Sequence, residues 1–120
     1  MVRVLALLSV LVAALAVTGA GAAKESFDLK GEVYASGFKI EMKTSANRAL
    51  RAVKAGTYRI KIEDHATSHN FHLVGPGVNK ATSVGGTVET VWRVRLRPGT
   101  YRFFCDPHSG MMRGSFRVTA

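Results

Sequence analysis

Apolar and charged residues alternate along most of this chain, and this alternation is what most constrains its fold. The period is two residues, which predicts β-strands that bury one face and expose the other. It is clearest in segments 27–33, 38–43, 58–63, 92–97, 101–105 and 115–119. Turns that contain glycine or proline separate these segments about every ten residues, a spacing typical of β-sandwiches. We therefore predict an all-β protein, an antiparallel Greek-key β-sandwich or barrel of about seven or eight strands.

Segment 46–53 is ambiguous between a helix and a strand. Its apolar residues fit one face of a helix, while Asn47-Arg48 fits a turn that precedes a short strand. We predict the turn and the strand.

The beginning of the chain differs from the rest. A positively charged start is followed by the uncharged apolar run 4–17 and then by small residues. This order is the layout of a secretory signal peptide, and the apolar run is shorter than the roughly 20 residues that span a bilayer. We predict a signal peptide at 1–22, cleaved after Ala22 or Ala23, and one domain at 23–120. The protein is then expected to be exported, to the periplasm or the extracellular space, without stable membrane insertion after cleavage.

The chain is basic, with 17 Lys and Arg against 8 Asp and Glu among its 120 residues and a formal net charge of +9. A basic surface can face nucleic acid, anionic lipid or an acidic protein. Export makes nucleic acid the weakest of these, and the basic residues alternate with apolar ones instead of forming a cluster. The outward faces of strands account for most of the charge, and we expect no nucleic-acid binding.

The chain has one cysteine, Cys105. In an oxidising compartment an unpaired thiol becomes oxidised or cross-linked unless something protects it. An inert buried cysteine, a catalytic nucleophile and a metal thiolate are all open at this point. The neighbours favour the metal, because Cys105 ends the inward-facing series of Tyr101 and Phe103, and His108 and two methionines follow within a short loop. Two histidines, a cysteine and a weak axial methionine form the blue-copper electron-transfer site.

Such a site needs a second histidine, and the stretch DHATSHNFHLVGPG offers His65, His69 and His72. In a strand that starts there, His69 shares a face with Phe71, while Asn70 and His72 point to the other face. The apolar face is expected to look inward, so we predict His69 as the ligand. His72 is expected to be a solvated surface histidine, and His65 lies in the preceding loop without such an alignment.

These residues resemble two motifs of the cupredoxins, in particular the small exported copper proteins of the plastocyanin, amicyanin and azurin group. The early motif reads Ser68-His69-Asn70-Phe71 and the late motif reads Cys105-Asp106-Pro107-His108-Ser109-Gly110-Met111-Met112-Arg113-Gly114. Either motif alone is weak, and the two together are specific. The resemblance implies that the side chain of Asn70 hydrogen-bonds toward the cysteine loop and stiffens it.

The resemblance also implies one type 1 copper ion with His69, Cys105 and His108 as its strong ligands. A methionine would be the weak axial ligand. Met111 and Met112 both have suitable spacing, and the register of the M-x-G motif before the last strand favours Met112.

The function that the resemblance implies is that of an exported carrier, not an enzyme, which shuttles single electrons between redox partners. The electron would leave through the edge of His108, within an apolar patch expected to contain Pro76, Pro107, Gly110 and Met111. Lys and Arg around this patch would suit an acidic redox partner in a small, weak and salt-dependent complex. We expect the protein to be a monomer.

Other functions are open on the sequence alone. Copper storage, delivery or resistance would treat the metal as cargo, and a metal-free interaction sandwich would keep Cys105 for its packing. A cysteine protease would need a base and an oriented third group, usually with the cysteine at a helix N-terminus. A multicopper oxidase or copper nitrite reductase would place histidines beside the cysteine, where this chain has Phe104 and Asp106, and a dinuclear copper site would need a second cysteine.

Overall fold

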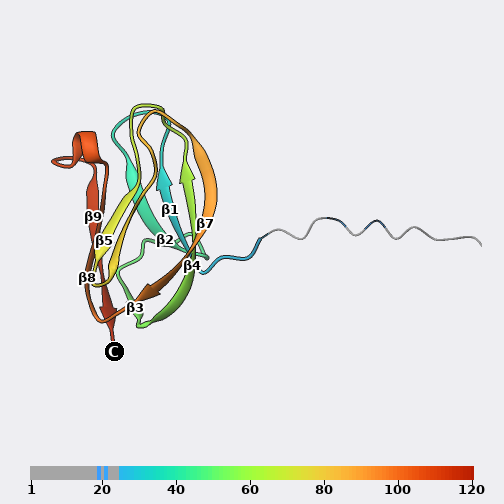
Figure 1. The fold of residues 1–120 in the computed structure, drawn as a ribbon, viewed down its shortest axis with the longest axis vertical. Coiled ribbons are helices and arrows are strands. Elements are labelled where there is room, and N and C mark those ends of the chain that lie inside the picture. The colour runs from blue at the N-terminus through green and yellow to red at the C-terminus, as the bar shows by residue number, and fades with distance from the viewer. Residues whose placement is uncertain (1–18, 20, 22–24) are drawn as a thin grey trace, which may run out of the picture.

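Strands make up nearly all the regular structure of this protein in a computed structural model that describes residues 19, 21 and 25–120 (Figure 1). Within these residues there are nine: β1 (Leu29–Val33), β2 (Ile40–Thr44), β3 (Ala52–Lys54), β4 (Gly56–Asp64), β5 (His72–Gly75), β6 (Val78–Ala81), β7 (Val88–Leu96), β8 (Gly99–Phe104) and β9 (Arg113–Thr119). One 3-10 turn, η1 (Asp106–His108), lies between β8 and β9. The predicted signal peptide lies outside the described residues except for Gly19 and Gly21.

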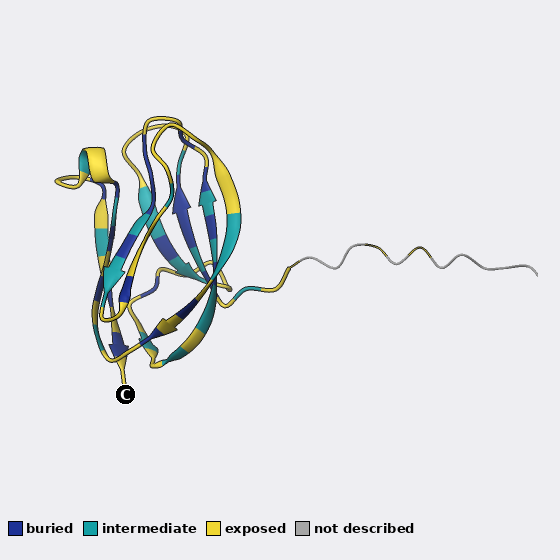
Figure 2. Ribbon diagram, in the orientation of Figure 1, coloured by how far each residue is buried: buried dark blue, intermediate teal, exposed yellow. Residues whose placement is uncertain are grey.

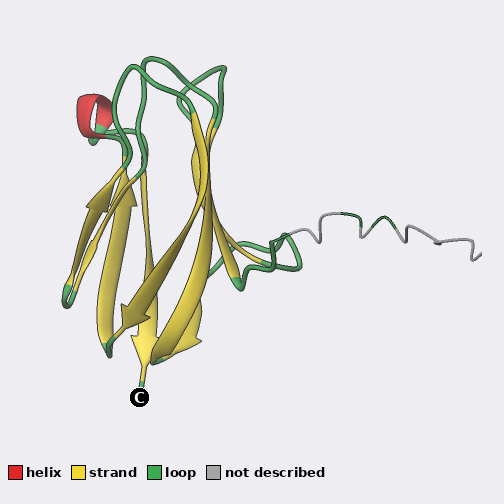
Figure 3. Cartoon of the chain, turned by 45° about the vertical axis from the view of Figure 1, so that its right-hand side comes forward, coloured by secondary structure: helices red, strands yellow, loops and turns green. Residues whose placement is uncertain are grey.

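The strands form two sheets that face each other as the layers of a sandwich (Figure 3). The four-stranded sheet has the order β2-β1-β4-β7, and the five-stranded sheet has the order β3-β9-β8-β5-β6. The predicted all-β sandwich is therefore confirmed. Two details differ from the prediction: there are nine strands in the described part, and the pairs β1–β4 and β3–β9 are parallel while the other pairs are antiparallel.

The strand expected in segment 46–53 is present as β3, and a turn precedes it. Asn47 adopts a φ of 62°, a left-handed conformation that asparagine tolerates better than most residues. The alternation signal missed β6, where only Val78 is buried and the three following residues are exposed. A short edge strand of this kind has too few buried positions to show a period of two.

The core lies between the two sheets and is formed by the buried positions of the strands, which are dark blue in Figure 2. Phe71 and Phe103 stack with ring centroids 6.0 Å apart, and Tyr101 stacks on Phe116 at 5.4 Å. Burial of each such side chain contributes about 1.5–3 kcal/mol. Gly31 in β1 makes room for this packing, because a Cβ atom there would lie 2.5 Å from Cζ of Phe71.

The pairing of β5 with β8 brings the two sequence motifs to the same end of the sandwich. His72, the first residue of β5, pairs with Phe104, the last residue of β8. The residues just before β5 and just after β8 are therefore neighbours, although more than thirty positions separate them in the chain. In the part of the chain that the structure describes, no helix combines the length and the apolar character needed to cross a bilayer.

Candidate metal centre

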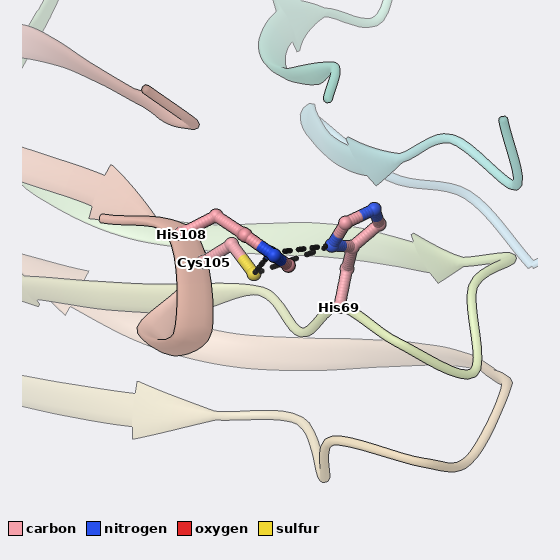
Figure 4. Close-up of side chains that lie close together, drawn as sticks. All are labelled: His69, Cys105 and His108. Atoms are coloured by element: carbon pink, nitrogen blue, oxygen red, sulfur yellow. Dashed lines mark hydrogen bonds between the residues drawn. The ribbon is translucent and has the colours of Figure 1, made fainter. Parts of the chain in front are cut away.

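Three side chains with metal-binding atoms meet at this end of the sandwich (Figure 4). His69 precedes β5, Cys105 follows β8, and His108 ends η1. Sγ of Cys105 lies 3.7 Å from Nδ1 of His69 and 3.6 Å from Nδ1 of His108. The two Nδ1 atoms are 3.0 Å apart. The structure thus brings together the three residues that the sequence singled out as strong ligands.

The sulfur of this cluster is shielded from solvent. Cys105 is 0% exposed and His69 is 5% exposed, while His108 is half-buried. Cys105 is a free cysteine. A buried thiol is protected from the oxidation that an exposed thiol would undergo.

His69 presents a lone pair to this cluster. Its Nε2 atom lies 3.1 Å from the backbone oxygen of Gly37, in the loop between β1 and β2. A carbonyl oxygen only accepts hydrogen bonds, so Nε2 carries the proton and donates it. In a neutral imidazole the Nδ1 atom is then unprotonated, and it faces Cys105 and His108. The contact with Gly37 therefore orients the ring with its metal-binding nitrogen inward.

The arrangement of the three atoms fits one metal ion. The point equidistant from them lies about 2.0 Å from each, close to the roughly 2.0–2.3 Å that separate such metals from imidazole nitrogen and thiolate sulfur. A donor set of one thiolate and two imidazoles suits copper. The residues of this chain therefore fit a copper ion without rearrangement of the backbone.

Backbone hydrogen bonds close the loop that carries Cys105 and His108. The N–H of Met112 donates to the oxygen of His108 at 2.8 Å, and the N–H of Cys105 donates to the oxygen of Met112 at 3.0 Å. Met112 is 0% exposed, whereas Met111 is 62% exposed. The two methionines that were equivalent by spacing thus differ completely in their surroundings.

Asn70 braces this loop from the neighbouring segment. Its Oδ1 accepts a hydrogen bond of 2.8 Å from the N–H of Asp106, and its Nδ2 donates to Oδ2 of Asp106 at 2.6 Å and to the oxygen of Thr82 at 3.1 Å. The expected hydrogen bonding of Asn70 toward the cysteine loop is present. Asn70 and His72 both contact Asp106, as expected for two residues on the face opposite His69 and Phe71. Asn70 is nevertheless buried, since it contacts both Asp106 and Thr82, although the strand itself begins only at His72.

His72 does not belong to the three-residue cluster, but it is not the solvated histidine that was predicted. It is half-buried, with Nδ1 2.8 Å from Oδ1 of Asp106 and Nε2 2.6 Å from Oδ1 of Asn79. Burial alone would lower the pKa of His72, but the hydrogen bonds with Asn79 and Asp106 outweigh it and raise the pKa above its ordinary value. Burial would raise the pKa of Asp106, but bonds from His72 and Asn70 keep it below its usual range.

His65, the third histidine of the early motif, lies in a second cluster away from Cys105. Its Nε2 atom is 3.7 Å from Oε1 of Glu32 and 3.6 Å from Oε2 of Glu63. Both carboxylates also contact lysines, which for Glu32 are Lys30 and Lys43.

Sequence reasoning misplaced two residues near the expected apolar patch. Phe38 was expected inside a strand, but it precedes β2, is 56% exposed, and lies with its ring centroid 5.7 Å from that of His69 and 5.0 Å from that of His108. Pro76 was expected beside His108, but it contacts Gly99, the first residue of β8, at the end of the strand opposite Cys105. The loop sequence around Phe38 contains no local signal of its contact with the histidines, because that contact crosses between the two sheets.

Comparisons with known proteins agree with the chemistry of this centre. The sequence model of a family described as copper binding proteins, plastocyanin/azurin family, matches residues 14–119. No curated protein matches the chain. Among solved structures, auracyanin A, a "blue" copper protein from the green thermophilic photosynthetic bacterium Chloroflexus aurantiacus, is similar with 16% identity and a TM-score of 0.45, over 75% of this chain and 96% of auracyanin A.

Proposed function

The chain belongs to the plastocyanin/azurin family of copper-binding proteins, and from this premise we propose that it is a type 1 blue copper protein that carries single electrons between redox partners. The observation that supports this most is the largely buried triangle of Cys105, His69 and His108, whose donor atoms all lie within 4.8 Å of one another. Copper would supply a one-electron couple between Cu(II) and Cu(I) at this centre.

Rigidity is the property of these residues that supports electron transfer. His69 is held by the oxygen of Gly37, and the loop of Cys105 is held by Asn70 and by its own backbone bonds. A site whose donor atoms are fixed in this way changes little between two oxidation states of a bound ion. The protein's part in the reaction is therefore to hold the donors, to exclude water from the sulfur and to keep Cys105 available as a thiolate.

We assign Met112 as the axial ligand. Met112 is completely buried and its backbone hydrogen-bonds to Cys105 and His108, so its thioether would be the one available to a copper ion held by the triangle. Met111 is exposed and is assigned to the rim of the site.

Carriage rather than catalysis is supported by the surroundings of the cysteine. The neighbours of Cys105 are Phe104 and Asp106, so no histidine beside the sulfur connects it to another metal. The Asp106 carboxylate is directed to Asn70 and His72 and away from the triangle. His69 and His108 lie within reach of the sulfur as possible bases, but Cys105 is 0% exposed, so its sulfur is not open to attack a substrate.

An apolar surface surrounds the centre and supports transient contact with a partner. The exposed large hydrophobic residues of the described chain are Phe38, Val84, Val88 and Met111. Phe38 contacts both histidine rings, Val88 pairs with the last residue of β4, and Val84 lies in the loop that follows β6. All four thus lie at the end of the sandwich that holds the triangle. We propose that a redox partner approaches at this end and that His108 is the nearest ligand to it.

We also propose that the protein is exported and works as a monomer with an acidic redox partner. The layout of residues 1–22 supports export. The net charge of +9 supports an acidic partner, and complexes of this kind are small and sensitive to salt.

Copper cargo is the competing function, and the same titration separates the two. Purified reduced protein is mixed with Cu(II) while optical and electron paramagnetic resonance spectra are recorded, and then the copper is reduced and reoxidised. An electron carrier turns intensely blue and keeps its copper through repeated cycles. A pale complex that releases copper on reduction would establish cargo binding and refute our proposal.

The axial assignment is tested in the same experiment. Met112→Leu is expected to change the resonance spectrum and the reduction potential, because the axial ligand tunes both. Met111→Leu is the matched control and is expected to leave both unchanged. The opposite result would move the axial ligand to Met111.

A further inference from the structure

The outer face of β8 and β9 carries arginines that have no acidic partner. Arg102 pairs with Ser115 across these strands, and Phe104 pairs with Arg113, so the two arginines are diagonal neighbours on one face. Neither forms an ion pair with any carboxylate that the structure describes. Two like charges at such positions weaken a sheet slightly, and here nothing within the described chain compensates them.

A hollow of about 590 Å³ lies between these side chains. Its lining residues are Arg102, Phe104, Ser109, Arg113, Gly114 and Ser115. Two guanidinium groups and two hydroxyls provide hydrogen-bond donors, and the half-buried ring of Phe104 provides an apolar surface. The hollow is therefore built to receive a group that is negatively charged and only partly polar.

The charges around the hollow contrast with those on the other sheet. On β1, β2 and β4, lysines and glutamates contact one another, as in Lys43 with Glu41 at 2.6 Å and Lys61 with Glu63 at 2.9 Å. Asp106 is the only Asp or Glu between Arg102 and Ser115 in the sequence, and it already binds His72 and Asn70. The charge of Arg102 and Arg113 is consequently available to a molecule from outside.

Protection of a sheet edge does not explain Arg102. Charged side chains commonly protect edge strands from pairing with other chains. Arg93 and Arg95 are exposed on β7, which is an edge strand, and fit that role. Arg102 lies on an interior strand, where it pairs with Val74 of β5 and with Ser115 of β9. Strand β3 pairs with β9 only at residues 117–119, so in the described chain Arg113 has β8 as its one neighbouring strand.

We propose that this hollow binds an acidic, extended segment of a protein partner. One carboxylate of the segment binds Arg102 and another binds Arg113, and the methylene groups of these acidic side chains pack on Phe104, because alternate residues of an extended chain point to the same face. Alternate residues of an extended chain lie about 6.6–6.8 Å apart, close to the roughly 7–8 Å between diagonal positions of an antiparallel pair. Acidic residues at every second position therefore match the spacing of the two arginines.

The position of the hollow links it to the metal centre. Phe104 directly precedes Cys105, and Ser109 directly follows His108. A partner held here lies beside the loop that carries two of the three donor atoms. The identification of this partner as the redox partner rests on the proposed electron-carrier function, whereas the binding of an acidic segment does not.

The test uses the acidic peptide acetyl-(Glu-Thr)4-amide as the probe and amide chemical shifts of ¹⁵N-labelled protein as the readout. The full protein is measured both with Cu(I) and without metal, so that the result is independent of the blue-copper proposal. The peptide is expected to shift residues 102–104, 109 and 113–115, and acetyl-(Lys-Thr)4-amide is expected to shift none of them. Binding should weaken steeply with added salt.

The double variant Arg102→Glu with Arg113→Glu is expected to raise the dissociation constant of the peptide by about tenfold or more, because charges that attracted now repel. The double variant Arg93→Glu with Arg95→Glu changes the net charge by the same amount, but on β7. It is expected to change the dissociation constant of the peptide by less than about twofold. Arg102→Gln with Arg113→Gln is a milder variant that shows the same order of effects if charge reversal disturbs folding.

If the two double variants raise the dissociation constant equally, the hollow is refuted as the binding site, since only the net charge of the protein would then affect binding. Peptide shifts centred on Arg93 and Arg95 would also refute it. The protein could instead fail to bind the peptide and bind phosphatidylglycerol vesicles through Arg102 and Arg113. That result would identify this face as a lipid-binding surface and would overturn the proposal. If the protein binds the peptide in the hollow but never turns blue, the docking inference stands and the electron-carrier function falls.

Discussion

Two clusters of three metal-binding residues exist in the described part of this protein, and they differ in almost every physical respect. One consists of His69, Cys105 and His108, the other of Glu32, Glu63 and His65, and in each the potential ligand atoms lie within 4.8 Å of one another. The first is largely buried and contains soft sulfur and nitrogen donors. The second is partly exposed and is dominated by hard oxygen donors.

Only the first cluster is a candidate for copper, because the carboxylates of the second cluster already contact lysines. Lys30 and Lys43 contact Glu32, and Lys30 and Lys61 contact Glu63. Burial would raise the pKa of both carboxyls, but hydrogen bonds and the positive charge of these lysines lower it, so both carboxylates are already compensated. Among the described residues, no lysine or arginine forms a hydrogen bond with the triangle around Cys105. Proximity of ligand atoms is therefore insufficient evidence for a metal site. The other contacts of these atoms determine whether they are available to a metal.

Removal of the sulfur should give the largest effect. In Cys105→Ser the intense visible absorption of the copper-loaded protein is expected to disappear, because it requires a thiolate ligand. Copper affinity should fall by more than the roughly 100-fold that marks the loss of a merely supporting residue. Competition titration with a copper chelator measures the affinity. The same titration on Glu63→Gln serves as the control from the other cluster, and a colourless Glu63→Gln protein would reverse the comparison.

Removal of the brace should give the next largest effect. Asn70→Ala removes three hydrogen bonds, which involve the N–H and Oδ2 of Asp106 and the oxygen of Thr82. A hydrogen bond contributes about 0.5–1.5 kcal/mol, so we expect the free energy of unfolding to fall by about 2–3 kcal/mol. Copper affinity should fall by roughly 10–100-fold.

Denaturant unfolding and the competition titration measure these two quantities. Asn79→Ala is the control, because Asn79 is exposed and contacts only the far side of His72. A drop in stability without any drop in affinity would show that the loop holds its geometry without Asn70.

His72 should make stability depend on pH in a smaller way. Because its pKa is raised above 6.5 in the folded protein, its stabilising effect is complete below about pH 6.5 and is lost as the pH rises through the raised value. We expect a contribution of about 1 kcal/mol, typical of a partly exposed ion pair. The measurement is the difference in unfolding free energy between the metal-free wild type and His72→Gln from pH 5.5 to 9. A difference that stays constant over this range contradicts the prediction.

The smallest effect is expected for the histidine of the second cluster. His65 is exposed and its carboxylate neighbours are compensated by lysines, so His65→Ala should change the unfolding free energy by no more than about 0.5 kcal/mol. It should leave the copper affinity unchanged. A fall in copper affinity on this substitution would show that the second cluster also binds the metal.

Local sequence patterns correctly predicted the features of this protein that depend on residues close together in the chain. The inward series of Tyr101, Phe103 and Cys105 follows from alternation along one strand, and all three are buried. Cys105 and His108 are close because three positions separate them across a tight 3-10 turn. These features depend on neighbours in the chain, so a single sequence is enough to predict them.

Contacts between distant segments escaped the same reasoning. Asn70 is buried because it contacts Asp106 and Thr82 from other segments, which the alternation around it does not predict. Phe38 lies against His69 and His108, whereas Pro76 lies far from them. The positions of the loops determine both, and a hydrophobic period along a strand does not predict them. The alternation also does not determine which strands pair or in which direction, so it did not predict the parallel pairing of β1 with β4.

The sequence by itself determined the class of fold, the chemistry of the donors and the half of the site that is local to the last loop. Only the tertiary structure decided that Nδ1 of His69 meets the sulfur and that Met112 is buried while Met111 is exposed. It also decided that Arg102 and Arg113 form no ion pair with the carboxylates of the described residues. The physical reason is that alternation records which side of a strand is buried, whereas the pairing of strands and the direction of loops come from packing between residues far apart in the chain.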